Sequence, residues 1–299
     1  MKPFVLITLL AIGFTHLSCS KEKQVPKESK ISKLSTVHKR KNAKTYYSLK
    51  EALKEPLKVY KLILSNVHLS PQTLKKLYTE VIKLKNLQDL ELSELNTRKI
   101  PTDIFKLKHL QSLLLSSAFD NLPKGIGNLD NLKYLSLSGN GFSVLPKELF
   151  KLKNLKYLNL SENELSSLPR EIYKLKHLET LYLGGNKLNT LPRGVGQLKK
   201  LRRLRLEKNK LNELPKVIFK LKNLEWLYIL SINISQLPVE IGRLKNLETL
   251  YLSWNKLETL PEEIGRLKKL KYLYLRGNPL SSKEKEKIKK LLPKCHIIF

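Results

Sequence analysis

The sequence predicts an α/β solenoid, with one parallel β-sheet on one side and short helices or 3-10 turns on the other. Two observations carry this prediction. The segment L-x-x-L-x-L, once with Ile as its last residue, recurs nine times, and its opening leucine returns every 22 or 23 residues from Leu87 to Leu270. In eight of these copies a proline follows the opening leucine, by 14 residues in seven of them and by 13 in the copy that opens at Leu110. Such a fixed period indicates stacked structural repeats.

The apolar residues within one unit predict its strand. In the copy that opens at Leu155, inside LKNLKYLNLSENELSSLPREIYK, apolar residues occupy positions 1, 4, 6, 11, 14, 18 and 21. Positions 3 to 7 alternate, so the leucines at 4 and 6 point inward and residues 3, 5 and 7 point outward. A weaker tenth unit opens at Val59. No unit can bury its leucines alone, so we expect about ten strands to stack over one continuous core.

Asn and Pro each recur at one fixed position of the unit. Asn recurs at position 9 as Asn140, Asn163, Asn186, Asn209, Asn255 and Asn278. Pro recurs at position 15, which fits the start of a helical segment where a missing N–H is harmless. Position 9 is not Asn in the units that open at Val59, Leu87, Leu110 and Leu224, so we expect irregular turns there. The unit at Leu110 is one residue short, which predicts a kink over residues 118–121.

This pattern resembles the leucine-rich-repeat family, specifically the bacterial 23-residue type with the LPxxI signature, and is similar to exported repeat proteins of spirochaetes. The resemblance implies a curved right-handed superhelix with a concave parallel sheet and convex short helices or 3-10 turns. It also implies that the position-9 Asn bonds backbone groups inside the turn. The role of this residue is then structural, since buried polar backbone groups need partners.

The N-terminus has the features of an export signal. A positive start at Lys2 precedes an apolar run over residues 4–14, which is too short to span a bilayer. Signal peptidase could cut after Ser20, or Cys19 could accept a lipid because the stretch before it resembles a bacterial lipobox. We therefore expect a secreted or outer-membrane, cell-surface protein. Cys295 is the one other cysteine, which excludes a framework of disulfides.

The chain divides into five predicted segments. Residues 1–20 form the signal peptide, and residues 21–45 form a flexible basic tether with few large apolar residues. Residues 46–58 form an N-terminal cap, residues 59–280 the repeats, and residues 281–299 a C-terminal cap. We expect helices to start at Ser48 in the N-terminal cap, at Ser70 in the long first repeat unit and at Ser282 in the C-terminal cap, and a final apolar strand over residues 296–299.

Aromatic and arginine side chains gather at positions 3 and 5, on the predicted concave face. The candidate protein-binding residues are Tyr134, Tyr157, Tyr182, Arg203, Arg205, Trp226, Tyr228, Tyr251, Tyr272 and Tyr274, with Trp254 on the rim. These residue types dominate the energetics of protein interfaces. The alternative is that the rings stack across neighbouring strands and only stabilise the sheet.

Lysines and arginines outnumber acidic residues by 57 to 26, which gives a net charge of +31. Many of them recur at positions 20 and 22, on the convex or edge side. Position 22 holds Lys85, Lys108, Lys153, Lys176, Lys199, Lys222, Lys245 and Lys268, with Asp130 interrupting the row after Lys108. Two such rows could bind an anionic glycan or lipid, with an affinity that falls as salt rises. We favour the alternative that they form a solvated face that keeps a repeat protein soluble. A third alternative is a purely structural envelope protein, in which neither surface binds a partner.

No motif for catalysis is present. The six histidines do not share the spacing of metal ligands, and we find no phosphate-binding loop, nucleophile elbow or pair of catalytic carboxylates. The sequence thus predicts a protein that is not an enzyme and has no cofactor or metal. We expect its partner to be another protein, extracellular or of a host, and expect no specific binding of nucleic acid.

Overall fold

The computed structural model describes residues 44–65, 70–95 and 97–299. The predicted signal peptide, Cys19 and nearly all of the predicted tether lie outside the described residues, as do residues 66–69 and 96. The remaining chain forms one compact unit.

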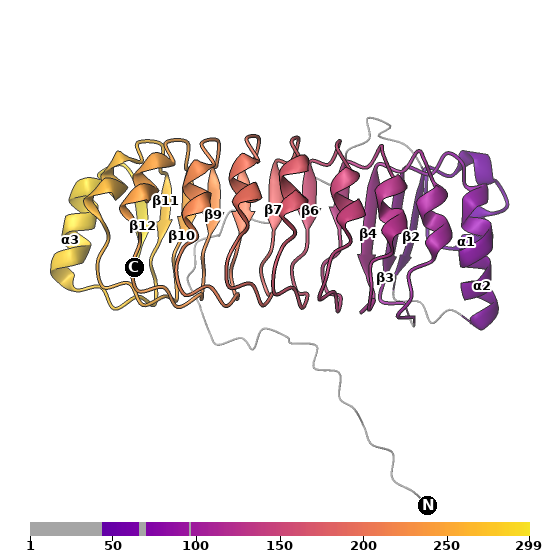
Figure 1. Cartoon of the computed structure of the whole chain (residues 1–299), viewed down its shortest axis with the longest axis horizontal. Coiled ribbons are helices and arrows are strands. Elements are labelled where there is room, and N and C mark those ends of the chain that lie inside the picture. The colour runs from indigo at the N-terminus through magenta and orange to yellow at the C-terminus, as the bar shows by residue number, and fades with distance from the viewer. Residues whose placement is uncertain (1–43, 66–69, 96) are drawn as a thin grey trace, which may run out of the picture. The chain divides into compact units, whose positions relative to one another are not determined.

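All strands join one parallel sheet in chain order, from β1 to β12 (Figure 1). The first four strands are β1 (Thr45–Tyr46), β2 (Lys61–Ser65), β3 (Asp89–Ser93) and β4 (Ser112–Ser116). The others are β5 (Tyr134–Ser136), β6 (Tyr157–Asn159), β7 (Thr180–Tyr182), β8 (Arg203–Arg205), β9 (Trp226–Tyr228), β10 (Thr249–Tyr251), β11 (Tyr272–Tyr274) and β12 (His296–Ile298). The sheet therefore extends the ten predicted repeat strands by one strand at each end, drawn from the caps.

Short 3-10 helices follow the prolines and lie on one face of the sheet (Figure 1). They are η4 (Thr102–Lys106), η5 (Lys124–Asn128), η6 (Lys147–Lys151), η7 (Arg170–Lys174), η8 (Arg193–Gln197), η9 (Lys216–Lys220), η10 (Val239–Arg243) and η11 (Glu262–Arg266). In each, the carbonyl of the preceding proline accepts the first hydrogen bond, as Pro146 does from the Leu149 N–H at 3.1 Å. The leucines between the sheet and these helices are almost fully buried and form one core.

Helices close both ends of the described unit. At the first end lie α1 (Leu49–Ala52), η2 (Pro56–Lys58), α2 (Pro71–Glu80) and η3 (Val81–Lys83), and at the other lies α3 (Ser282–Leu291). The three predicted helix starts are confirmed. The hydroxyls of Ser48 and Ser70 each accept a backbone N–H at the start of α1 and α2. The N-cap of α3 is Ser281, one residue before the predicted start.

The strands from β5 to β11 contain only positions 3 to 5, two residues fewer than predicted. In six of these seven repeats the position-9 asparagine accounts for this difference, whereas β9 is equally short with Ile232 at that position. In the repeat of β6, the Asn163 amide donates to the carbonyls of Leu160 at 3.0 Å and Ser161 at 3.1 Å, which are positions 6 and 7. It also donates to Leu137 of the preceding repeat at 2.8 Å. The turn therefore begins early, and neighbouring repeats are joined through one side chain.

Two of the four units without this asparagine have irregular turns, those that open at Leu110 and Leu224; the unit at Leu87 has the usual left-handed residue at Glu94, and residues 66–69 of the unit at Val59 lie outside the described residues. Position 8 has a left-handed backbone in most repeats, but in the short unit this conformation moves to Ala118, at position 9. The unit at Leu224 has two left-handed residues, Ser231 and Asn233. Ser117 partly replaces the missing amide, since its hydroxyl accepts the Leu95 N–H at 2.9 Å.

Candidate functional site

The sheet face that the 3-10 helices leave uncovered is the predicted concave face, and we call it the open face. Its side chains come from positions 3 and 5 of each strand. Because the strands pair in register, each position forms a column across the sheet, with Arg205, for example, opposite Tyr182 on β7 and Tyr228 on β9. All of the predicted face residues on β5 to β11 occur in these two columns.

The position-5 column is a tight stack. The rings of Tyr228, Tyr251 and Tyr274 lie nearly parallel, with successive centroids 4.1 Å apart. The Arg205 guanidinium lies between Tyr182 and Tyr228, 5.3 and 5.1 Å from their ring centres. Tyr182 and Tyr251 are only 6% and 7% exposed. Much of this column therefore stabilises the sheet, which was the alternative reading of the aromatic residues.

The position-3 column is more accessible. Tyr134 and Tyr157 stack at 6.2 Å, and the Arg203 guanidinium lies 5.6 Å from the Trp226 ring centre. Tyr272 is 37% exposed at the far end of the column. Arg203 and Trp226 are half-buried on rigid neighbouring strands, so their groups are held in place and still reach solvent.

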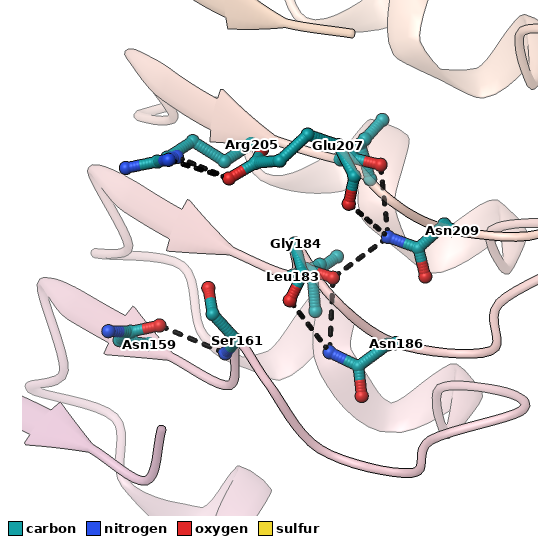
Figure 2. A network of polar contacts seen from close by, with 9 residues as sticks. Asn159, Ser161, Leu183, Gly184, Asn186, Arg205, Glu207 and Asn209 are labelled. Carbon is teal, nitrogen blue, oxygen red and sulfur yellow. Dashed lines mark hydrogen bonds and ion pairs between the residues drawn. The ribbon is translucent and has the colours of Figure 1, made fainter. Parts of the chain in front are cut away.

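The Arg205 charge is neutralised inside the chain. Its guanidinium forms an ion pair with Glu207, with 2.7 Å between Arg205 Nε and Glu207 Oε1 (Figure 2). Burial disfavours the charged guanidinium, but the carboxylate more than offsets this and the pKa of Arg205 is raised. Figure 2 also shows the asparagine side chains of successive repeats bonding the backbone directly beside this pair, for example Asn209 to Leu183.

Burial also changes the acidity of the tyrosines. It raises the pKa of Tyr228 to about 12, and the pKa values of Tyr157 and Tyr251 are raised further for the same reason. These phenols are neutral at physiological pH. The open face therefore presents aromatic surface and hydroxyl donors rather than phenolate charge.

Trp254 occupies the rim, as predicted, and is 56% exposed. Its φ of 57° lies in the left-handed region, which a bulky residue rarely adopts. One face of its ring rests on Gly277, where an added Cβ would lie 2.6 Å from a ring carbon. The Arg276 guanidinium lies 5.8 Å from the ring centre. The same backbone conformation recurs at position 8 of most repeats, so what distinguishes Trp254 is its large exposed side chain and not its φ.

A second asparagine series was not recognised from the sequence as structural. At position 23, the amides of Asn131, Asn154, Asn223 and Asn246 each donate to a backbone carbonyl of the preceding repeat at 2.8 to 2.9 Å. The recurrence of Asn at this position was the available signal. Two repeats have His109 and His177 at position 23 in place of Asn, and both histidines are exposed.

Beside these asparagines lies a row of paired charges at position 2. Arg202 pairs with Glu225 at 2.7 Å, and Lys271 pairs with Glu248 at 3.0 Å. A shallow cavity of about 410 Å³ opens here. It is lined by Glu179, Lys200, Arg202, Asn223, Glu225 and Asn246. Its lining side chains are polar, and the charges of the acidic and basic ones largely neutralise each other.

The position-22 lysines form what we call the lysine edge, namely Lys85, Lys108, Lys153, Lys176, Lys199, Lys222, Lys245 and Lys268. All eight are exposed. Among the residues that the structure describes, none of the eight forms an ion pair. Several position-20 cations do pair, such as Lys106 with Asp103 at 2.6 Å.

Three further features concern metal binding, membrane-spanning helices and the Cys295 thiol. The described residues contain no cluster of three or more His, Cys, Asp or Glu side chains that could hold a metal ion. Among these residues, no helix has the length and apolar character needed to cross a membrane. Burial in the C-terminal cap raises the pKa of the Cys295 thiol to about 11.

The chain belongs to the leucine-rich-repeat family. The family model described as a leucine-rich repeat region matches residues 58–155, 143–233 and 216–291. No curated protein matches the sequence. A leucine-rich-repeat protein of Leptospira interrogans is 30% identical over 86% of this chain and 100% of its own, with a TM-score of 0.36.

Two other solved structures share the fold. The leucine-rich-repeat ectodomain of a membrane receptor kinase from Arabidopsis thaliana is 31% identical, with a TM-score of 0.63, and was solved in complex with CASPARIAN STRIP INTEGRITY FACTOR 2. The match covers 75% of this chain but only 30% of that ectodomain. An internalin of Listeria monocytogenes is 22% identical over 81% of this chain and 75% of its own, with a TM-score of 0.57.

Proposed function

We propose that this chain is an exported protein-binding module that engages an extracellular or host protein through its open face. The observation that carries the proposal is the accessible set of Arg203, Trp226, Trp254 and Tyr272, held on rigid strands or against them. Tryptophan, tyrosine and arginine contribute most of the binding energy at protein interfaces. The similar plant ectodomain, solved in complex with CASPARIAN STRIP INTEGRITY FACTOR 2, adds support from the fold.

A binding array tests this proposal. The full chain is applied to extracellular proteins and sulfated glycans at low and high salt. We expect a protein ligand whose binding survives high salt and is lost in the double variant Trp226→Ala/Tyr272→Ala. The matched control is Lys199→Glu/Lys222→Glu on the lysine edge, which should bind normally. Loss of binding in the control alone would contradict the proposal.

The lysine edge supports a second candidate function, the binding of an anionic glycan or lipid. The supporting observation is that eight lysines recur along the repeats, with one interruption at Asp130, and none of them has an internal carboxylate partner among the described residues. Polyanions release counterions when they bind such a row, so affinity falls steeply with salt. This candidate predicts that the same array yields sulfated glycans, that high salt abolishes binding, and that Trp226→Ala/Tyr272→Ala has no effect.

Export and its processing are part of the proposal. The N-terminal segment would be removed by cleavage after Ser20, or Cys19 would carry a lipid that anchors the protein at the cell surface. The mass of the N-terminal peptide of the mature protein distinguishes these two outcomes. A mature protein that retains residues 1–18 would contradict both.

A further inference from the structure

We propose that the partner of the open face presents an acidic segment, and that a carboxylate of this segment pairs with Arg203. This inference rests on the proposed function and narrows the class of partner. Three arginines lie on or beside β8, and they differ in whether they form an internal ion pair. Arg202 pairs with Glu225 at 2.7 Å and Arg205 pairs with Glu207 at 2.7 Å. Arg203 forms no ion pair within the described part of the chain, and its recorded contact is with the Trp226 ring.

The surroundings of Arg203 offer no free internal carboxylate. Its neighbours in register are Thr180 on β7 and Trp226 on β9, and both are uncharged. Glu207 and Glu225, next to β8 and β9, are already held by the other two arginines. Glu179, next to β7, lies 3.6 Å from Lys156.

When a partner covers this face, the Arg203 charge affects the free energy of binding. A guanidinium has five N–H donors, and in the free protein water can satisfy those that Trp226 does not cover. A partner that covers the column removes this water. An unpaired buried charge is strongly unfavourable, so a neutral partner surface would be penalised at this point. A carboxylate offsets the penalty through short charge-assisted hydrogen bonds to a group that is already oriented.

A guanidinium can bind several kinds of anion. The aromatic rings beside Arg203 favour an acidic protein segment among them. Trp226 lies beside Arg203, and its ring is 6.4 Å from that of Tyr228. A protein segment supplies both an acidic side chain and the apolar contacts that such rings favour. The unpaired lysines, which suit a repetitive polyanion, lie on the edge and not on this column.

A library of random linear peptides displayed on phage serves as the probe. The full chain and four variants are used as bait at physiological salt. Arg203→Glu reverses the proposed charge, and Arg203→Lys keeps it. Lys199→Glu makes the same change of net charge on the lysine edge and is the matched control. Trp226→Ala reports whether a peptide uses the open face, and thermal unfolding of each bait confirms that it is folded.

We expect peptides that depend on Trp226 to be enriched in Asp and Glu. Their affinity should fall about 30-fold or more with Arg203→Glu, since reversing one partner of a desolvated pair is costly. It should change by about threefold or less with Lys199→Glu, because exposed charges are screened, and Arg203→Lys should retain the acidic preference.

Three results would overturn the inference. Peptides that need Trp226 but are neutral, or are insensitive to Arg203→Glu, contradict the acidic partner and leave the proposed function intact. Acidic peptides lost with Lys199→Glu instead place the recognition on the lysine edge. A library that yields no peptide dependent on Trp226 contradicts the proposed function itself.

Discussion

Single asparagines carry much of the connection between repeats. The Asn163 side chain is 4% exposed and bonds three backbone carbonyls and the Phe142 N–H. Asn163→Ala leaves these buried groups without partners, so the free energy of unfolding should fall by about 3 kcal/mol. Urea unfolding measures this. Asn154 is exposed and makes one such bond, so Asn154→Ala should lower the same quantity by about 1 kcal/mol or less. Equal losses would show that the buried network is not the cause.

Gly277 supports the exposed Trp254. Its φ is 75°, and an added Cβ would meet the Trp254 ring at 2.6 Å. Gly277→Ala should therefore lower the free energy of unfolding by about 1–2 kcal/mol and displace the indole, seen as a shift in tryptophan fluorescence. Gly141→Ala is the control, since its Cβ would meet only ordinary contact at 3.6 Å. An unchanged emission spectrum in Gly277→Ala would mean that the ring does not rest on this glycine.

The tyrosine stack predicts a pH dependence. The pKa of Tyr228 is about 12 in the folded chain because burial favours the neutral phenol, whereas the unfolded value is near 10. The unfolded state therefore loses its proton first, so this residue's contribution to stability is complete below pH 10 or so and is lost as pH rises towards 12. Absorbance at the phenolate band should show a late titration, and Tyr228→Phe should reduce its amplitude by one tyrosine, since Tyr157 and Tyr251 also titrate late. A titration complete near pH 10 would contradict the buried stack.

At the scale of elements, α3 closes the core through one carboxylate. Glu284 is 8% exposed, and its Oε1 accepts the Leu260 N–H at 2.8 Å and lies 2.7 Å from Lys287 Nζ. Glu284→Ala should remove about 2 kcal/mol of stability and speed hydrogen exchange at the Leu260 amide. Glu286 lies on the same helix but is exposed, so Glu286→Ala should leave that amide protected. Equal exchange in both variants would show that Glu284 does not cap the terminal repeat.

The repeat elements could be predicted because each depends on a few residues inside one unit. The alternation around Leu158 specifies a strand, and Pro169 specifies where the next helical segment begins. The strand ends could not be read this way, because they depend on which carbonyls Asn163 takes. The extra strand β12 was foreseen as apolar, but its pairing with β11 depends on the cap as a whole.

At the scale of the whole molecule, the position of the candidate site was easier to predict than its accessibility. The two-residue alternation places Arg203 and Tyr251 on one face of the sheet. It does not reveal that Tyr251 is covered by its stacked neighbours or that Glu207 neutralises Arg205. Both depend on side chains of adjacent repeats, and on the rotamers that they adopt. The structure thus narrows the candidate surface to the position-3 column and the rim.

The most direct test of the central claim is the dissociation constant of the tightest protein ligand from the binding array. It is measured for the unmodified chain and for Trp226→Ala/Tyr272→Ala, at low and high salt. We predict that the double variant binds at least about 30-fold more weakly, the effect of losing about 2 kcal/mol from an interface hot spot, while salt changes the affinity little. Unchanged affinity in the variant, together with loss of binding at high salt, would contradict the claim and place binding on the lysine edge.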